Sequence, residues 1–114
     1  MRRKLVISKF KLRSLVTSFR KGMLNGRSSD NFCFMMCFPL QGYLSAIGVK
    51  TSLVEGELMR AHHCWLEMED GTIIDPTLDQ FQSDSRIIKL PKVFIGSKDI
   101  YGHKKIIKYK CYGC

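Results

Sequence analysis

The sequence contains no long apolar run. Met1-Arg2-Arg3-Lys4 is followed by only four residues before Lys9, whereas a secretory signal needs an uninterrupted apolar stretch of about 7–15 residues. No segment approaches the roughly 20 apolar residues of a membrane span. We therefore expect a cytoplasmic protein with neither a signal peptide nor a transmembrane segment.

The cysteines do not suit a disulfide framework. The chain has five of them, and an odd number without a secretory signal favours reduced thiols. Cys111 and Cys114 form a single Cys-x-x-Cys motif, whereas a closed zinc site needs four ligands. Cys64, His62 and His103 could complete such a site on paper. We nevertheless expect two free thiols in a disordered tail, with no metal and no other cofactor.

Acidic side chains are missing from the first 27 residues. Residues 1–27 carry nine basic and no acidic side chains, residues 28–85 carry two and nine, and residues 86–114 carry eight and one. The three segments therefore have charges of +9, −7 and +7, which sum to +9. Two basic ends favour an anionic partner such as an acidic protein. Nucleic acid is the weaker alternative, because no sequence-reading motif accompanies the basic residues.

Two helices are expected in the first half of the chain. Over residues 8–24 apolar side chains recur at helical spacing between basic ones, which predicts an amphipathic helix with a solvated basic face. Residues 31–47 are apolar nearly all round, which predicts a buried helix. Ser29 or Asp30 is expected to cap it. Pro39 removes a backbone donor inside this segment, so we expect a kink or a later helix start.

Short strands are expected after residue 48. The candidates are Lys50–Val54, His63–Met68, Thr72–Asp75, Arg86–Leu90, Lys92–Ile95 and Ile106–Cys111. The last should be an edge strand, because its lysines discourage edge-to-edge pairing. Helices first and strands after predict one α+β domain over residues 1–114, with N-terminal helices packed on an antiparallel β-sheet.

Three residues carry candidate chemistry, namely Cys33, His63 and Asp75. Cys33 follows a predicted helix start, and a helix N-terminus lowers the pKa of a thiol. A histidine is the natural base for such a thiol, and a carboxylate orients the histidine. We expect Cys33 to be the nucleophile, His63 the base and Asp75 the orienting group.

His63 and Asp75 are expected to meet across a β-hairpin. If residues 69–71 form a three-residue loop with the glycine at positive φ, Trp65 faces Asp75. Alternation then places His63, Trp65 and Asp75 on one face of the sheet. His63 and Asp75 become diagonal neighbours, about 7–8 Å apart at the backbone. A two-residue loop would put them on opposite faces.

This ordered set resembles the transglutaminase-like branch of the papain-type cysteine enzymes. The matching pieces are Cys33, Gly48-Val49, Leu53-Val54-Glu55-Gly56, His63-Cys64-Trp65 and Gly71-Thr72-Ile73-Ile74-Asp75-Pro76-Thr77. The continuations Leu78-Asp79-Gln80-Phe81 and Pro91-Lys92-Val93-Phe94-Ile95-Gly96 are similar to small bacterial and phage members of this group.

The resemblance implies a fold, an activity and a substrate class. It covers a papain/transglutaminase-like core at about residues 29–96, with the basic helix 8–24 before it and a basic strand and tail, 97–114, after it. It implies an acyl-transfer triad of Cys33, His63 and Asp75. The substrates would be amides in a peptide or protein, either peptide bonds or glutamine side chains, so that the enzyme would be a peptidase, a deamidase or a transglutaminase.

The sequence departs from that pattern near the nucleophile. No Gln precedes Cys33 to serve as oxyanion donor, which leaves the amide of Cys33 and a guessed donor, Asn31. Residue 64 is Cys where the family usually has a small residue. Trp65 is expected to lie in the core beside His63 and to shield the triad from water.

Two rivals and one alternative function remain open. Cys37 lies one helical turn after Cys33 and is a rival nucleophile, although a core position suits it better. Asp79 is the rival of Asp75, and His62 should point away from His63 toward the surface. The alternative to an enzyme is an inactive relative that acts as a basic binding module for nucleic acid or an acidic protein.

Overall fold

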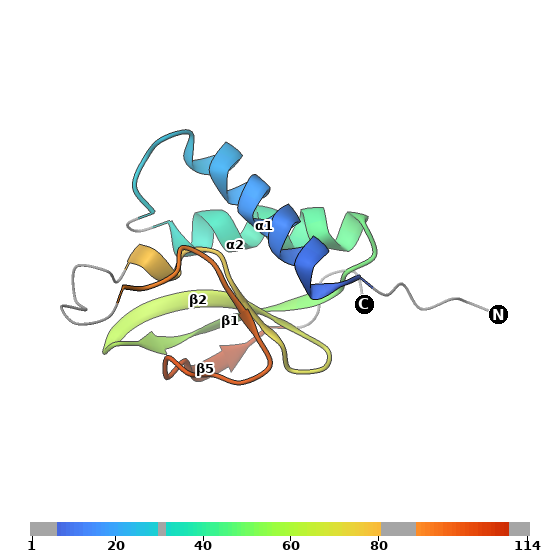
Figure 1. Cartoon of the computed structure of the whole chain (residues 1–114). Coiled ribbons are helices and arrows are strands. Elements are labelled where there is room, and N and C mark those ends of the chain that lie inside the picture. The colour runs from blue at the N-terminus through green and yellow to red at the C-terminus, as the bar shows by residue number, and fades with distance from the viewer. Residues whose placement is uncertain (1–6, 30–31, 81–88, 110–114) are drawn as a thin grey trace.

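The chain folds into two layers, with two helices on one side of a five-stranded sheet (Figure 1). The computed structural model describes residues 7–29, 32–80 and 89–109. Its elements are α1 (Lys9–Leu24), α2 (Cys33–Ala46), β1 (Thr51–Leu58), β2 (Ala61–Met68), β3 (Ile73–Asp75), β4 (Phe94–Gly96) and β5 (Lys104–Lys108). The strand order is β4-β3-β2-β1-β5, and every neighbouring pair is antiparallel. The predicted α+β class, with N-terminal helices on an antiparallel sheet, is confirmed.

The hairpin of β1 and β2 is longer than predicted. The two strands pair along their whole length, and Met59 and Arg60 form the turn between them with φ angles of 52° and 65°. Such turns usually carry Asn or Gly, so nothing in the sequence marks this one. The predicted strands Lys50–Val54 and His63–Met68 are therefore too short.

The remaining strands are shifted or shortened. Lys92–Ile95 is replaced by β4, and Ile106–Cys111 by β5, which forms one edge of the sheet as expected. Of the predicted strand Arg86–Leu90, residues 86–88 lie outside the described residues, and Lys89 and Leu90 are not in a strand. The tail with Cys111 and Cys114 also lies outside them.

α1 buries one face. Its buried side chains are Leu12, Val16, Arg20 and Leu24, each four residues from the next, and the Ser8 hydroxyl caps the helix by accepting from the Lys11 amide at 3.0 Å. The predicted amphipathic helix is confirmed, but its basic face is not wholly solvated. Arg20 lies in the interface with the rest of the domain, because it meets buried acceptors there.

α2 begins at Cys33 and continues through Pro39 to Ala46, so the later helix start expected from Pro39 is wrong. The cap prediction is wrong for Ser29. The N-cap is Phe32, whose side chain makes no capping hydrogen bond among the described residues, while the Ser29 hydroxyl donates to a carboxylate of another segment. Asp30 lies outside the described residues.

The composition of α2 predicted a helix that is buried on all sides, and this prediction is wrong. Phe34, Met35 and Phe38 are exposed on its outer face. This exposure explains why the helix tolerates Pro39, since the carbonyl that loses its partner belongs to Met35, where water can reach it. Within the described ranges, neither helix has the length and apolar character that a membrane crossing requires.

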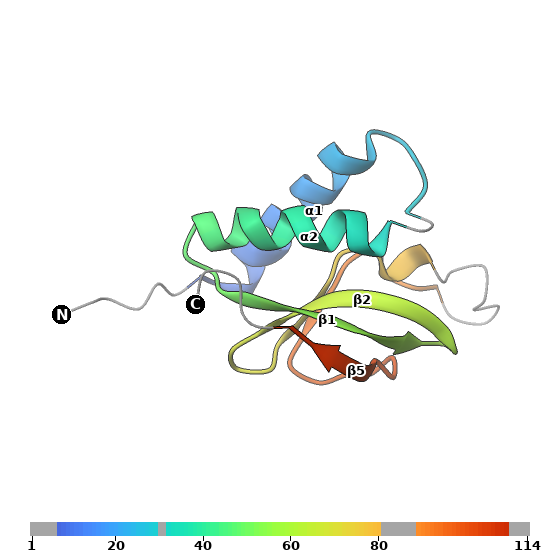
Figure 2. The ribbon, with the colours of Figure 1, turned by 180° about the vertical axis from the view of Figure 1, so that it is seen from behind.

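Residues 97–103, the crossing segment, connect β4 to β5, which lie at opposite edges of the sheet. The segment therefore runs across one face of the sheet, and it packs on the face that carries Trp65, opposite the helices (Figure 2). Gly56 of β1 permits this close approach, because a Cβ there would collide with the Lys104 carbonyl and the Trp65 ring. The crossing segment brings residues from the end of the domain to the middle of the sheet.

Candidate active site

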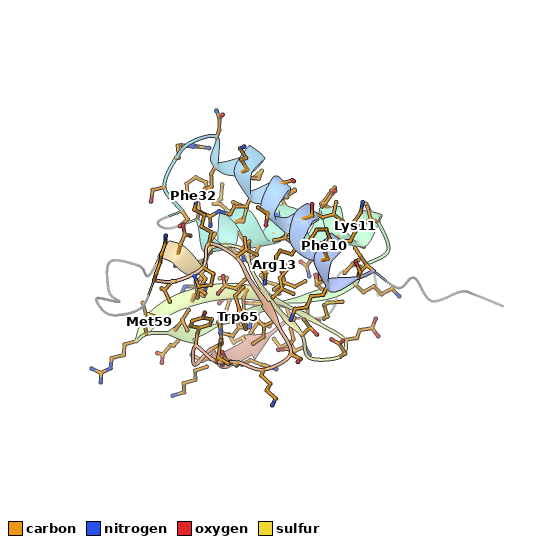
Figure 3. All side chains as sticks on the ribbon, in the orientation of Figure 1. Phe10, Lys11, Arg13, Phe32, Met59 and Trp65 are labelled. Carbon is orange, nitrogen blue, oxygen red and sulfur yellow. The ribbon has the colours of Figure 1, made fainter. Side chains whose placement is uncertain are left out.

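The start of α2 is held in place by a partly buried ion pair. The guanidinium of Arg20 binds both carboxylate oxygens of Asp79, at 2.7 and 2.8 Å, and donates to the Pro76 carbonyl at 2.8 Å. Ser29, four residues before Cys33, donates its hydroxyl to the same carboxylate at 2.7 Å. Figure 3 shows Phe32 at the same end of the molecule as Met59 of the β1–β2 turn. Asp79 therefore connects the segment before α2 to the turn after β3, and it is a positioning residue and not the partner of His63.

His63 and Asp75 form a direct, fully buried hydrogen bond. His63 Nε2 lies 2.7 Å from Asp75 Oδ2, and neither side chain has exposed surface. The strand register explains the contact, since Leu66 pairs with Ile74 and Gly71 adopts a φ of +90° in a three-residue loop. The predicted loop length and the predicted meeting of the two residues are both confirmed.

A second histidine, His103, binds the same carboxylate. Its Nε2 lies 2.8 Å from Asp75 Oδ2, and its Nδ1 lies 2.7 Å from Asp99 Oδ1. Burial disfavours the charged ring, but hydrogen bonds and charges of the two carboxylates raise the pKa of His103 above its usual value. Because both ring nitrogens face carboxylates, His103 is held as an imidazolium. The sequence analysis missed this role, since no short-range pattern links residues 75 and 103.

Gln80 completes the surroundings of His63. Its Nε2 lies 3.2 Å from His63 Nδ1, and its Oε1 has no partner among the described residues. A half-turn of the amide would present Oε1 to a protonated Nδ1 and satisfy that oxygen. The sequence contained Gln80 in a matching motif, but spacing alone gave it no function.

Cys33 lies beside both Cys64 and His63. A hydrogen bond from the Cys64 thiol lowers the pKa of Cys33, burial raises it, and the hydrogen bond and charge of His63 lower it further, to about 4. The same interaction raises the pKa of Cys64, whose proton is held by the neighbouring sulfur. At neutral pH Cys33 is therefore a thiolate and Cys64 a thiol.

His63 is the cationic partner of that thiolate. Burial favours the neutral ring, but the charge and hydrogen bond of Asp75, with those of Cys33, raise the pKa of His63 to about 9. Burial likewise opposes ionisation of Asp75, and the charges and hydrogen bonds of His63 and His103 bring its pKa below the usual value. Between about pH 4 and pH 9 the site holds a Cys33 thiolate and a His63 imidazolium.

The remaining candidate residues from the sequence have the following positions relative to Cys33 and His63. Trp65 is buried, with its ring centroid 5.9 Å from that of His63, as predicted for a core residue beside the histidine. Cys37 is fully buried and donates to the Cys64 carbonyl, and burial raises the pKa of its thiol, so it lacks the properties of a nucleophile. His62 is exposed, as predicted. Asn31 lies outside the described residues.

Among the residues that the structure describes, two groups of side chains have the donor atoms for a metal ion. Within each group the donor atoms lie within 4.8 Å of one another, and the groups are Cys33, His62 and Cys64, and His63, Asp75 and His103. In the second group the nitrogens lie 2.7 and 2.8 Å from Asp75 Oδ2, which are lengths of charge-assisted hydrogen bonds. The second group is a hydrogen-bonded network, whereas the first brings together two sulfurs and an exposed ring.

Replacing His103 is expected to change how tightly His63 holds its proton. The ring centroids of the two histidines lie 6.1 Å apart, so the His103 imidazolium repels a proton on His63. In His103→Asn, the pKa of His63 should rise by roughly one to two units. The pKa can be measured by NMR titration of the imidazole C–H signals. A purely structural His103 would leave the pKa unchanged or lower it, and Asp99→Asn should give a smaller shift in the same direction.

The residues that form the site come from α2, β2, β3, the turn after β3 and the crossing segment. No protein family model, no curated protein and no solved structure matches the chain.

Proposed function

We propose that the protein is a cysteine-dependent amide hydrolase or acyl transferase that uses a triad of Cys33, His63 and Asp75. One observation carries the proposal: a thiol at a helix start, with a pKa of about 4, lies next to a histidine with a pKa of about 9. The orienting carboxylate is 2.7 Å from that histidine and is fully buried. A structural cysteine has no need of this arrangement, which matches the requirements of nucleophilic catalysis.

The course of the reaction follows from the charged states of Cys33 and His63. The Cys33 thiolate attacks the amide carbonyl, and the His63 imidazolium gives its Nδ1 proton to the leaving amine as the C–N bond breaks. Neutral His63 then takes a proton from water or from an amine, which attacks the thioester and frees Cys33. Water gives hydrolysis, and an amine gives transamidation. Asp75 keeps the Nε2 proton of His63 in place in both steps.

The carbonyl oxygen also needs donors when it becomes negative. Cys33 is the first residue of α2, where the first-turn amides lack acceptors within the helix and the positive end of the helix favours an anion. Gln80 offers the nearest side-chain amide, as it already contacts His63 Nδ1 at 3.2 Å. We assign the oxyanion to the Cys33 amide and the Gln80 side chain, in place of the guessed Asn31.

The finer fold assignment belongs to the same proposal. A nucleophile at the start of a helix, a histidine on one strand and an aspartate at the end of the next are the expected parts of a papain/transglutaminase-like core. Here they are Cys33 on α2, His63 on β2 and Asp75 on β3. The resemblance of motifs over residues 29–96 supports this class.

Formation of an acyl-enzyme tests the proposal. Peptide 4-nitrophenyl esters have a leaving group that any competent thiolate can displace, so the native chain should gain one acyl mass on Cys33 at pH 6. Loss of that mass in buffer alone indicates hydrolysis, and loss only after a primary amine is added indicates transamidation. Cys33→Ser should remove the adduct, and Cys37→Ser should retain it. Acylation spread equally over the cysteines, or none at all, would refute the proposal.

A basic groove favours the second candidate function, a binding module for an acidic partner. Arg13, Lys21, Arg27 and Lys92 line a groove between α1 and residues 91–93. Arg13 and Arg27 already donate to backbone carbonyls of this chain, which reduces the donors left for a partner. The groove becomes the leading candidate if Cys33 forms no acyl-enzyme.

A further inference from the structure

Cys33 belongs to a second group of possible ligand atoms, in addition to the triad. His62 and Cys64 are two residues apart on β2, so their side chains leave the same face of the strand. The donor atoms of Cys33, His62 and Cys64 all lie within 4.8 Å of one another. His62 has no part in the proposed acyl transfer, and Cys64 contributes to it only through its hydrogen bond to Cys33.

The chemistry of the three atoms suits a thiophilic cation. Zinc bonds of about 2.3 Å to sulfur and 2.0–2.1 Å to nitrogen place tetrahedral ligands about 3.5–3.8 Å apart. The observed limit of 4.8 Å exceeds that spacing by about 1 Å at most. The hydrogen bond between the two sulfurs shares one proton, and a divalent cation can replace that proton.

The position of His62 gives the ion access. Cys33 and Cys64 are buried, whereas the His62 side chain is 66% exposed. Glu55 Oε2 lies 3.7 Å from His62 Nε2, so this carboxylate adds negative charge beside the ring. The site thus combines two sulfurs in the interior with a ring at the surface and a carboxylate behind it.

We propose that Cys33, His62 and Cys64 form a binding site for Zn²⁺, and that the bound ion inhibits the enzyme. Binding joins the Cys33 thiolate, the Cys64 sulfur and neutral His62 to the metal, and releases the Cys64 proton to solvent. The electron pair that Cys33 would donate to a carbonyl is then shared with the metal. The binding stands without the proposed function, and only the inhibition rests on it.

Cobalt spectroscopy tests the binding. The full chain is used with Cys111→Ser and Cys114→Ser, so that the Cys-x-x-Cys pair near the C-terminus contributes nothing. Added Co²⁺ should give a near-ultraviolet thiolate-to-cobalt band, and excess Zn²⁺ should remove it. Cys64→Ser should leave about half of the band intensity, and Glu69→Ala in the loop after β2 should leave all of it. The absence of a band, or a full band in Cys64→Ser, would overturn the site.

Protection from alkylation tests the inhibition. Zn²⁺ should slow the reaction of Cys33 with iodoacetamide, with each variant's zinc-free rate as its own reference. His62→Ala should raise the zinc concentration for half-protection by at least about tenfold, and Glu69→Ala should not change it. Equal protection in His62→Ala would overturn the role of His62. A cobalt band with an unreactive Cys33 would refute the acyl-transfer proposal and leave the metal site intact.

Discussion

Alkylation of Cys33 by iodoacetamide is expected to proceed at nearly the same rate from about pH 5 to about pH 8. The pKa of Cys33 is about 4, so its thiolate fraction is constant over this range. An ordinary thiol with a pKa near 8.5 gains roughly 10³-fold in thiolate over the same three units. The measurement is the second-order alkylation rate against pH with a chelator present, with the modified residue identified by mass spectrometry.

Two variants show what produces the plateau. His63→Ala removes the cation, so the acid limb of the rate profile should move upward in pH while the Cys64 hydrogen bond still favours the thiolate. Cys64→Ala removes the hydrogen bond that contributes most to the low pKa, so the acid limb should move upward while His63 still favours the thiolate. A tenfold rise in rate per pH unit in the native chain would show that Cys33 is an ordinary buried thiol.

Loss of the Asp75 charge is expected to destabilise the fold by about 3–5 kcal/mol, because it leaves buried groups without their charged partner. Asp75 accepts hydrogen bonds from His63 and His103 and has no exposed surface. Domains of this kind are stable by only about 5–15 kcal/mol. Asp75→Asn keeps the side-chain volume, so it is the variant to measure by urea unfolding. Asp99→Asn is the matched control, since Asp99 is partly exposed and should cost much less.

The stability that the Asp75 charge contributes should depend on pH in a direction set by the pKa shifts of Asp75 and His63. The folded pKa of Asp75 is lowered, so its contribution is present above the unfolded value of about 3.9 and is lost as pH falls further. The folded pKa of His63 is raised to about 9, so its contribution is complete below about 6.5 and is lost as pH rises toward 9. The stability gap between the native chain and Asp75→Asn should be largest near pH 5–6. A gap that is independent of pH would argue against the ionic network.

Local chemistry made part of the site predictable. Asp70-Gly71 marks a turn but leaves its length open, because Asp-Gly also suits a two-residue loop. With the three-residue loop that we supposed, strand alternation places His63 and Asp75 together. The same reasoning kept His62 on the surface and Trp65 in the core. These inferences needed only the residues of one hairpin.

Contacts between distant segments were not predictable in this way. His103 reaches Asp75 because the crossing segment joins opposite edges of the sheet, and periodicity carries no information on that path. Arg20 looked like a solvated base because its partner, Asp79, is 59 residues away. The turn at Met59 and Arg60 has left-handed backbone without Asn or Gly, so the hairpin that it closes appeared shorter in the sequence.

The path of the crossing segment affects the order in which the site is assembled during synthesis. Cys33, His63 and Asp75 are all synthesised before residues 97–103, and long-range closure of the sheet edges is the slower folding step. Until His103 arrives, the buried carboxylate of Asp75 lacks one of the three hydrogen-bond donors that it has among the described residues, the others being His63 and the Thr77 amide. A nascent chain therefore carries the nucleophile before the electrostatic surroundings of its histidine are complete.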